Sequence, residues 1–305
     1  MAERSLPLAC FGKLPFWPEY LEHGVSYPSS RALKDFLLRG RSAMEYAEEG
    51  GVDSGEERGS RFVIALAGSL ELLVGFVGPS TDLGGLRRFP FAVFAHLPRR
   101  FYGKHYALLP VGLDGVWEIL EDTWRGLTEL SSDAAFSEMA ASTRIPMPRD
   151  PGEARAIYQA GLGEGAQRIF ESFPGTSPAG LAAGLPDLLR RLKQERQNPA
   201  ITAELPVSSS LEDAGVDAAA WLELLGRQFW LRRLEPSLFL DAGEGSGSRR
   251  LILRFGALDP MDYPLVFGVT GEGEQVLRPA QEHSGSGSPP PLNSLKEFTT
   301  WKISF

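Results

Sequence analysis

The chain has 305 residues, of which 43% are hydrophobic and 23% are charged, and this composition is typical of a folded protein with a sizeable core. Its formal net charge of −8 argues against nonspecific binding to nucleic acid or to an anionic membrane, because the summed field repels phosphate. A single cysteine, Cys10, excludes an internal disulfide and favours a reducing compartment. The sequence shows neither the apolar core of a signal peptide nor an apolar run long enough for a membrane span, so we expect a cytoplasmic protein.

The first 60 residues predict a strand followed by a helix. An apolar run at residues 8–15 predicts a strand that ends near Pro15, because proline cannot donate a ladder hydrogen bond. Ser29 or Ser30 then offers an N-cap for a helix whose apolar residues recur at steps of three and four. The double glycine Gly50-Gly51 predicts the end of this helix.

The densest apolar runs are residues 62–77 and 89–97, on either side of a polar connector, residues 78–88. Runs this rich in Val, Ile and Phe are typical of strands buried on both faces of a sheet. Gly68-Ser69 interrupts the first run, which therefore predicts two strands rather than one. We expect these strands to form the centre of an α/β fold, a mixed β-sheet with helices on both faces.

The second half of the chain predicts more helices and then a return to strands. Asp114 is the predicted cap of a helix whose apolar stripe includes two tryptophans. Residues 145–210 predict a helical insertion or linker, in which residues 199–210 have no clear period. Strands are predicted near residues 237–240, 251–255 and 301–305. We therefore divide the chain into residues 1–144, 145–210 and 211–305, and expect the first and last parts to complete one sheet.

Side chains that could carry catalysis form no strong motif. Paired histidines and cysteine pairs are missing from the sequence, so we expect no zinc site and no cofactor. Most carboxylates, Glu48 and Glu57 among them, are assigned to solvated faces or loops. One alternative stays open, a hydrolase or nucleotide-handling enzyme that uses Ser80, Asp82 and His96, against which His96 can equally be a residue packed in the sheet.

Two short motifs occur in order along the chain. The first is Phe11-Gly12-Lys13-Leu14-Pro15, at the end of a predicted strand. The second runs from Gly75 to Asp82 as GFVGPSTD and is followed by Arg87-Arg88-Phe89-Pro90. In this order and with these strand contexts, the motifs resemble those of the TagF (ImpM) accessory proteins of bacterial type VI secretion. The resemblance covers roughly residues 8–130, is faint at residues 217–260, and does not extend to residues 145–210.

One loop departs from the family pattern. The family commonly continues Gly-Lys-Leu-Pro with Ser-Arg-Gly-Asp-Phe, whereas this chain continues with residues 16–20, FWPEY. The acidic and aromatic positions survive as Glu19 and Tyr20, but the arginine and the glycine are lost. Trp17 either adds aromatic surface for a partner or packs on its own sheet, and the sequence leaves both readings open.

The resemblance implies a non-enzymatic protein that represses type VI secretion post-translationally in the cytoplasm and is linked to the forkhead-associated scaffold of that system. This chain carries no sign of the phosphatase to which some family members are fused, because paired metal-binding aspartates are missing from the sequence. We expect the partner to bind near the strand ends, at Lys13, Trp17, Glu19, Tyr20, Ser80, Asp82, Arg87 and Arg88. A further hypothesis places the binding element in residues 145–210 instead.

Overall fold

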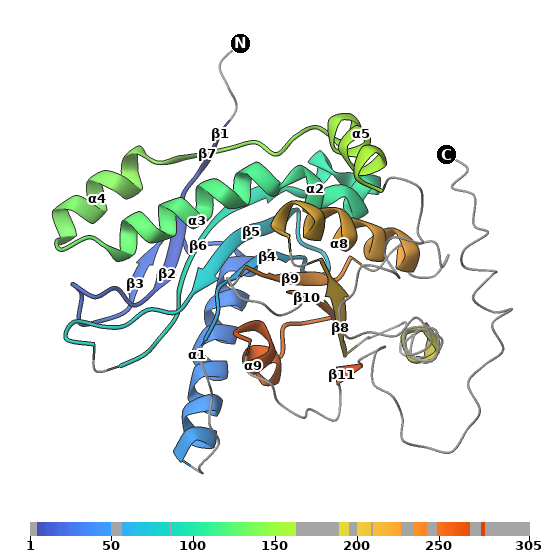
Figure 1. Ribbon diagram of the computed structural model, residues 1–305. Coiled ribbons are helices and arrows are strands. Elements are labelled where there is room, and N and C mark those ends of the chain that lie inside the picture. The colour runs from blue at the N-terminus through green and yellow to red at the C-terminus, as the bar shows by residue number, and fades with distance from the viewer. Residues whose placement is uncertain are drawn as a thin grey trace, which may run out of the picture.

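A computed structural model describes residues 5–49, 57–85, 87–162, 189–194, 200–208, 210–226, 235–242, 249–268 and 276–277. These residues form a nine-stranded sheet, a separate two-stranded ladder and helices on both faces of the large sheet (Figure 1). The predicted α/β fold class is therefore confirmed. Within the described residues, no helix is long and apolar enough to cross a membrane.

The large sheet is antiparallel except at one edge, where the first two strands in the order below run parallel. Across the sheet the strands are β11 (Val276–Leu277), β8 (Ile201–Val207), β10 (Arg249–Phe255), β9 (Ser237–Asp241), β4 (Ser60–Ile64), β5 (Glu71–Gly78), β6 (Phe91–Pro98), β2 (Ala9–Gly12) and β3 (Leu21–His23). The small ladder pairs β1 (Ser5–Pro7) with β7 (Arg144–Pro146).

The central strands are β4, β5 and β6, as the two apolar runs predict. The first run is divided at Gly68, which has a φ of +77° in the turn between β4 and β5. Successive residues of β4 pack into opposite layers: Val63 lies in one core cluster, and Phe62 and Ile64 lie in the other. A strand with two apolar faces needs helices on both sides, and the chain supplies them.

One face of the sheet is covered by the helices that contribute to the larger core cluster. They are α2 (Leu109–Gly112), α3 (Asp114–Thr128), α4 (Asp133–Ser142), α5 (Pro151–Gly161) and α8 (Leu211–Gly226), preceded by the short 3-10 helices η1 (Arg99–Phe101) and η2 (Gly103–Leu108). The opposite face is covered by α1 (Pro28–Glu49) and α9 (Tyr263–Val266), which follows η4 (Pro260–Asp262) (Figure 1).

Two local predictions are wrong. Residues 199–210, assigned to a linker, contain β8, which pairs with β10 along all seven of its residues. Pro206 and the small side chain of Ala203 weaken the strand signal, although alternate residues of β8 do enter the core. Asp114 is the first residue of α3 rather than its N-cap, which is Leu113, and its carboxylate accepts a 3.2 Å hydrogen bond from Arg61.

The strands on the two sides of the middle segment share the large sheet, because β9 pairs with β4 and places Phe239 opposite Phe62. The strand predicted at residues 301–305 lies outside the described residues, as does the whole segment from 163 to 188.

Candidate functional site

The two motif segments meet where β2 ends and β6 begins. Gly12, the last residue of β2, pairs with Phe91, the first residue of β6. Gly12 has a φ of +142°, and a Cβ there would lie 2.2 Å from the carbonyl oxygen of Pro90. Only glycine tolerates both the backbone conformation and this close approach. The contact between the Gly-Lys-Leu-Pro segment and the Phe-Pro segment therefore has a steric basis.

A buried ion pair joins the same two segments through their side chains. Nζ of Lys13 lies 3.3 Å from Oδ2 of Asp82 and 3.3 Å from the carbonyl oxygen of Pro18. Lys13 is 3% exposed and Asp82 is 7% exposed. The backbone N–H of Arg87 donates a 2.9 Å hydrogen bond to the other oxygen of Asp82. That bond and the neighbouring ammonium of Lys13 hold the pKa of Asp82 below its ordinary value, so the carboxylate stays charged.

Hydrogen bonds to backbone carbonyl groups complete the connection between the loop that follows β2 and the connector between β5 and β6. The hydroxyl of Ser80 donates to the carbonyl oxygen of Lys13 at 2.8 Å, and the N–H of Phe89 donates to the carbonyl oxygen of Ser80 at 3.0 Å. The N–H of Leu83 donates to the carbonyl oxygen of Trp17 at 3.3 Å. The connector between β5 and β6 thus holds the loop that follows β2 at several points.

The ring of Tyr20 closes this cluster on its outer side. It lies 5.8 Å from the ring of Phe11 in a stacked arrangement and 4.8 Å from the ring of Phe89 edge-on. Nζ of Lys13 lies 5.1 Å from the centre of the Tyr20 ring, within reach of a cation–π interaction. Tyr20 nevertheless remains 44% exposed. It offers a rigidly supported aromatic face to solvent.

The predicted site residues therefore divide by exposure. Lys13 and Asp82 are buried and hold the loops together, so they cannot present their charges to a partner. Trp17 is half-buried and packs against the larger core cluster, which favours the second of its two readings. The exposed members are Glu19, Tyr20, Arg87 and Arg88, and together with their exposed neighbours Pro18 and Leu83 they form what we call the motif surface.

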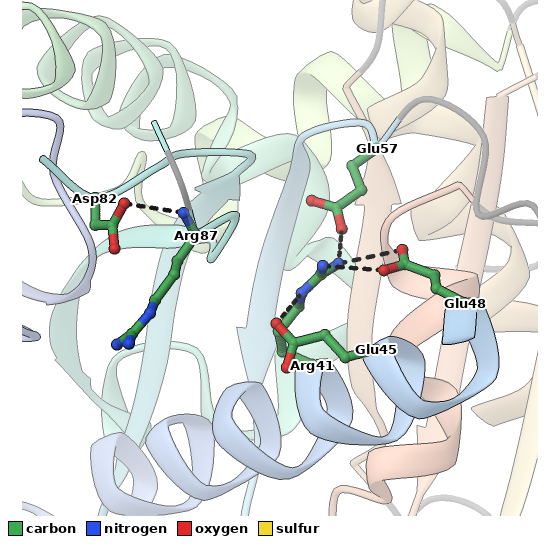
Figure 2. A network of polar contacts seen from close by, with 6 residues as sticks. All are labelled: Arg41, Glu45, Glu48, Glu57, Asp82 and Arg87. Carbon is green, nitrogen blue, oxygen red and sulfur yellow. Dashed lines mark hydrogen bonds and ion pairs between the residues drawn. The ribbon is translucent and has the colours of Figure 1, made fainter. Parts of the chain in front are cut away.

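A cluster of acidic side chains lies beside the motif surface. Figure 2 shows the guanidinium of Arg41 among three glutamates, in a group separate from Asp82 and Arg87. Arg41 lies 3.1 Å from Glu45, 3.2 Å from Glu48 and 2.9 Å from Glu57. The prediction that Glu57 is a solvated loop residue is wrong, because its side chain is 8% exposed. Burial raises its pKa in spite of Arg41, which must balance three carboxylates at once.

The residues of the alternative enzyme site are not brought together. Phe91, the first residue of β6, pairs with Gly78 at the end of β5. His96 lies five residues further along β6, which places it roughly 16 Å from Phe91 along the strand. Its ring lies 4.3 Å from the ring of Tyr27, and burial lowers its pKa. Ser80 and Asp82 lie beyond the opposite end of these strands, where the hydroxyl of Ser80 donates to backbone. The geometry gives no nucleophile and base pair.

Metal and thiol chemistry find little support at this site. In the ranges that the structure describes, no three His, Cys, Asp or Glu side chains converge as metal ligands would. Cys10 is buried in β2, and burial raises the pKa of its thiol far above the ordinary range. A thiol in that environment is unreactive at neutral pH.

A second feature, which the sequence did not reveal, is a cavity of about 430 Å³ on the α2–α8 side of the sheet. Its polar lining comes from Lys104, His105, Arg155, Glu223 and Glu235. These residues lie on three helices and in the segment before β9, and they follow no sequence motif, so only the folded chain brings them together.

Comparison with known proteins leaves the family open. No protein-family model matches the chain, and no curated protein does. Among solved structures, the chain is similar to PA0076 from Pseudomonas aeruginosa PAO1, with 25% sequence identity and a TM-score of 0.39. The match covers 47% of this chain and 64% of that one. A likeness this partial assigns neither a family nor a function.

Proposed function

We propose that this chain is a non-enzymatic regulatory protein of bacterial type VI secretion. It acts in the cytoplasm, where it represses assembly post-translationally by binding a component such as the forkhead-associated scaffold of that system. The proposal starts from the resemblance of the two motifs to those of the TagF (ImpM) proteins.

One observation carries the proposal: the buried pair of Lys13 and Asp82 holds the two motif segments together. In a catalytic motif the charged groups would face a substrate, but here the charges of Lys13 and Asp82 face each other inside the protein. Their effect is to fix the loops that bear Tyr20, Arg87 and Arg88, all of which are exposed. Tyrosine and arginine are the residue types most enriched at the energetic centres of protein interfaces.

The experiment is a pull-down from bacterial lysate with the full chain as bait, read by mass spectrometry. The native chain should recover a forkhead-associated protein of the secretion system, and Arg87→Ala/Arg88→Ala should not. A matched control is Arg125→Ala, because Arg125 is an exposed arginine on α3 whose side chain is 61% exposed. Equal recovery by the native chain and the double variant would exclude the motif surface as the contact.

A further inference from the structure

The cavity on the α2–α8 side of the sheet has walls that are fixed by contacts between its elements. It is lined by η2, α5, α8, the residues that precede β9 and Phe255 of β10. The hydroxyl of Tyr106 in η2 donates a 2.5 Å hydrogen bond to the carbonyl oxygen of Pro236. Helices α5 and α8 pack so closely that a Cβ on Gly161 would lie 2.8 Å from a methyl carbon of Val216. A preformed cavity of about 430 Å³ falls within the size range of small-molecule sites.

Three basic side chains line this cavity, and they come from two elements. Lys104 and His105 belong to η2, and Arg155 belongs to α5. Nη2 of Arg155 lies 3.3 Å from Nδ1 of His105. Over the described part of the chain, neither Lys104 nor Arg155 forms an ion pair with a carboxylate. The positive charges of the exposed Lys104 and the half-buried Arg155 are therefore left for another partner.

Two acidic residues, Glu235 and Glu223, contribute to the lining. Glu235 lies 2.6 Å from Nε of Arg99, which neutralises it. Glu223 of α8 also has an interaction of its own. The rest of the lining is largely apolar and includes Leu108, Leu222, Leu225 and Phe255. The cavity thus combines a basic side with an apolar wall.

We propose that this cavity binds a small organic phosphate. The phosphate lies against Lys104, His105 and Arg155, and the organic group lies on the apolar wall formed by Leu222, Leu225 and Phe255. Two cations match the charge of a phosphate dianion better than that of a single carboxylate. The planar guanidinium of Arg155 can donate two parallel hydrogen bonds to phosphate oxygens.

Binding of a dianion should be coupled to proton uptake by His105. In the free protein the pKa of His105 is lowered by partial burial and then by Arg155 and Lys104, so its ring is neutral at pH 7. The charged groups around it are Lys104 on its own element, Arg155 on α5, Glu223 on α8 and Glu235 before β9. A bound phosphate would add negative charge beside the ring and raise its pKa toward neutrality.

The test is isothermal titration calorimetry of the full chain with phenyl phosphate at pH 7 and low salt. Phenyl phosphate should bind, and inorganic phosphate and benzoate should each bind at least about tenfold more weakly, since one lacks the apolar group and the other lacks the second charge. Repeating the titration in two buffers of different ionisation enthalpy should show net proton uptake. Failure of phenyl phosphate to bind, or equal binding of benzoate, would overturn the proposal.

Variants of the lining residues test which side chains contact the phosphate. Arg155→Ala should weaken phenyl phosphate binding at least about tenfold, because a hydrogen bond to a charged group is lost, and Arg155→Lys should fall between. His105→Asn should abolish the proton uptake. Arg125→Ala removes an exposed arginine that is not in the lining and should change nothing. Binding that is indifferent to Arg155→Ala, with the variant folded as judged by thermal unfolding, would contradict the assignment.

Discussion

Lys13 and Asp82 are 69 positions apart in the sequence, yet their side chains meet at 3.3 Å with little exposure to solvent. This pair links the end of β2 to the connector between β5 and β6. Because both groups are buried, each charge depends on the other for its compensation. The position of the exposed motif surface therefore depends on a contact that lies inside the protein.

Breaking this pair from one side should destabilise the protein more than removing both charges. Lys13→Met leaves the carboxylate of Asp82 without its ammonium, and Asp82→Leu leaves a buried ammonium without a counter-charge. The double variant Lys13→Met/Asp82→Leu should be more stable than the less stable single variant. Urea unfolding of the four proteins gives the coupling free energy. Additive losses would mean that the two charges do not stabilise one another.

Gly12 should tolerate alanine far less well than Gly68 does. Both have positive φ, but a Cβ on Gly12 would lie 2.2 Å from the carbonyl oxygen of Pro90, whereas a Cβ on Gly68 would meet no atom within 4 Å. Gly68→Ala should lower the free energy of unfolding by about 1 kcal/mol, from the backbone conformation alone. Gly12→Ala should lower it by about 3 kcal/mol or more. Equal losses in chemical denaturation would show that β2 and β6 do not approach this closely.

Arg61 should be among the most important charged residues for stability. It is 2% exposed, its guanidinium pairs with Glu121 and Asp114, and it lies 5.7 Å from the ring of Trp117. Arg61→Leu would leave the buried Glu121 with only the exposed Arg125, 3.9 Å away, as a counter-charge, so we expect a loss of about 3–5 kcal/mol.

The control for this variant is Arg125→Ala. The side chain of Arg125 is 61% exposed, pairs closely only with the exposed Asp122 and lies 3.9 Å from Glu121, so the loss should stay below about 1 kcal/mol. If Arg61→Leu were no worse than this surface variant in urea unfolding, the buried network would contribute nothing to stability.

The acid dependence of stability should differ in sign for Asp82 and Glu57. The pKa of Asp82 is lowered in the folded protein, so its contribution is present at neutral pH and is lost as the pH falls below about 4. The difference in stability between the native chain and Asp82→Asn should therefore shrink on acidification.

Glu57 should behave in the opposite way, because its folded pKa is raised by burial. The folded state then binds more protons than the unfolded state just above pH 4, so the native chain loses stability relative to Glu57→Gln as the pH rises from about 4 toward 7. Denaturation at pH 4 and pH 7 of the native chain and the two variants measures both trends. A Glu57→Gln curve that parallels that of Asp82→Asn would contradict the assigned environments.

The sequence predicts the parts of this fold that depend on local pattern. The apolar runs give β4, β5 and β6, and the helical spacing after Ser29 gives α1. The strand β8 escapes notice because Pro206 and Ala203 dilute its alternation, and its neighbours β10 and β11 come later in the chain. A strand of this kind is recognised by its pairing partners more readily than by its own residues.

The sequence likewise predicts some features of the candidate site and not others. The motif segments were identified from their residues, but which side chains are buried was not, because the contact of Lys13 with Asp82 is made across 69 positions. Likewise, Asp114 has the residue type of a helix cap, and its actual partner Arg61 lies 53 positions earlier. The cavity around Arg155 has no sequence signal, since single basic residues from separate helices are common in any chain.

The most direct test of the account is a binding titration between the full chain and the purified forkhead-associated scaffold of a type VI secretion system. The account predicts saturable binding that weakens at least about tenfold in Arg87→Ala/Arg88→Ala and is unchanged in Arg125→Ala, with all three proteins equally stable. Undiminished binding by the double variant would contradict the role of the motif surface. Absence of binding by the native chain would contradict the proposed partner.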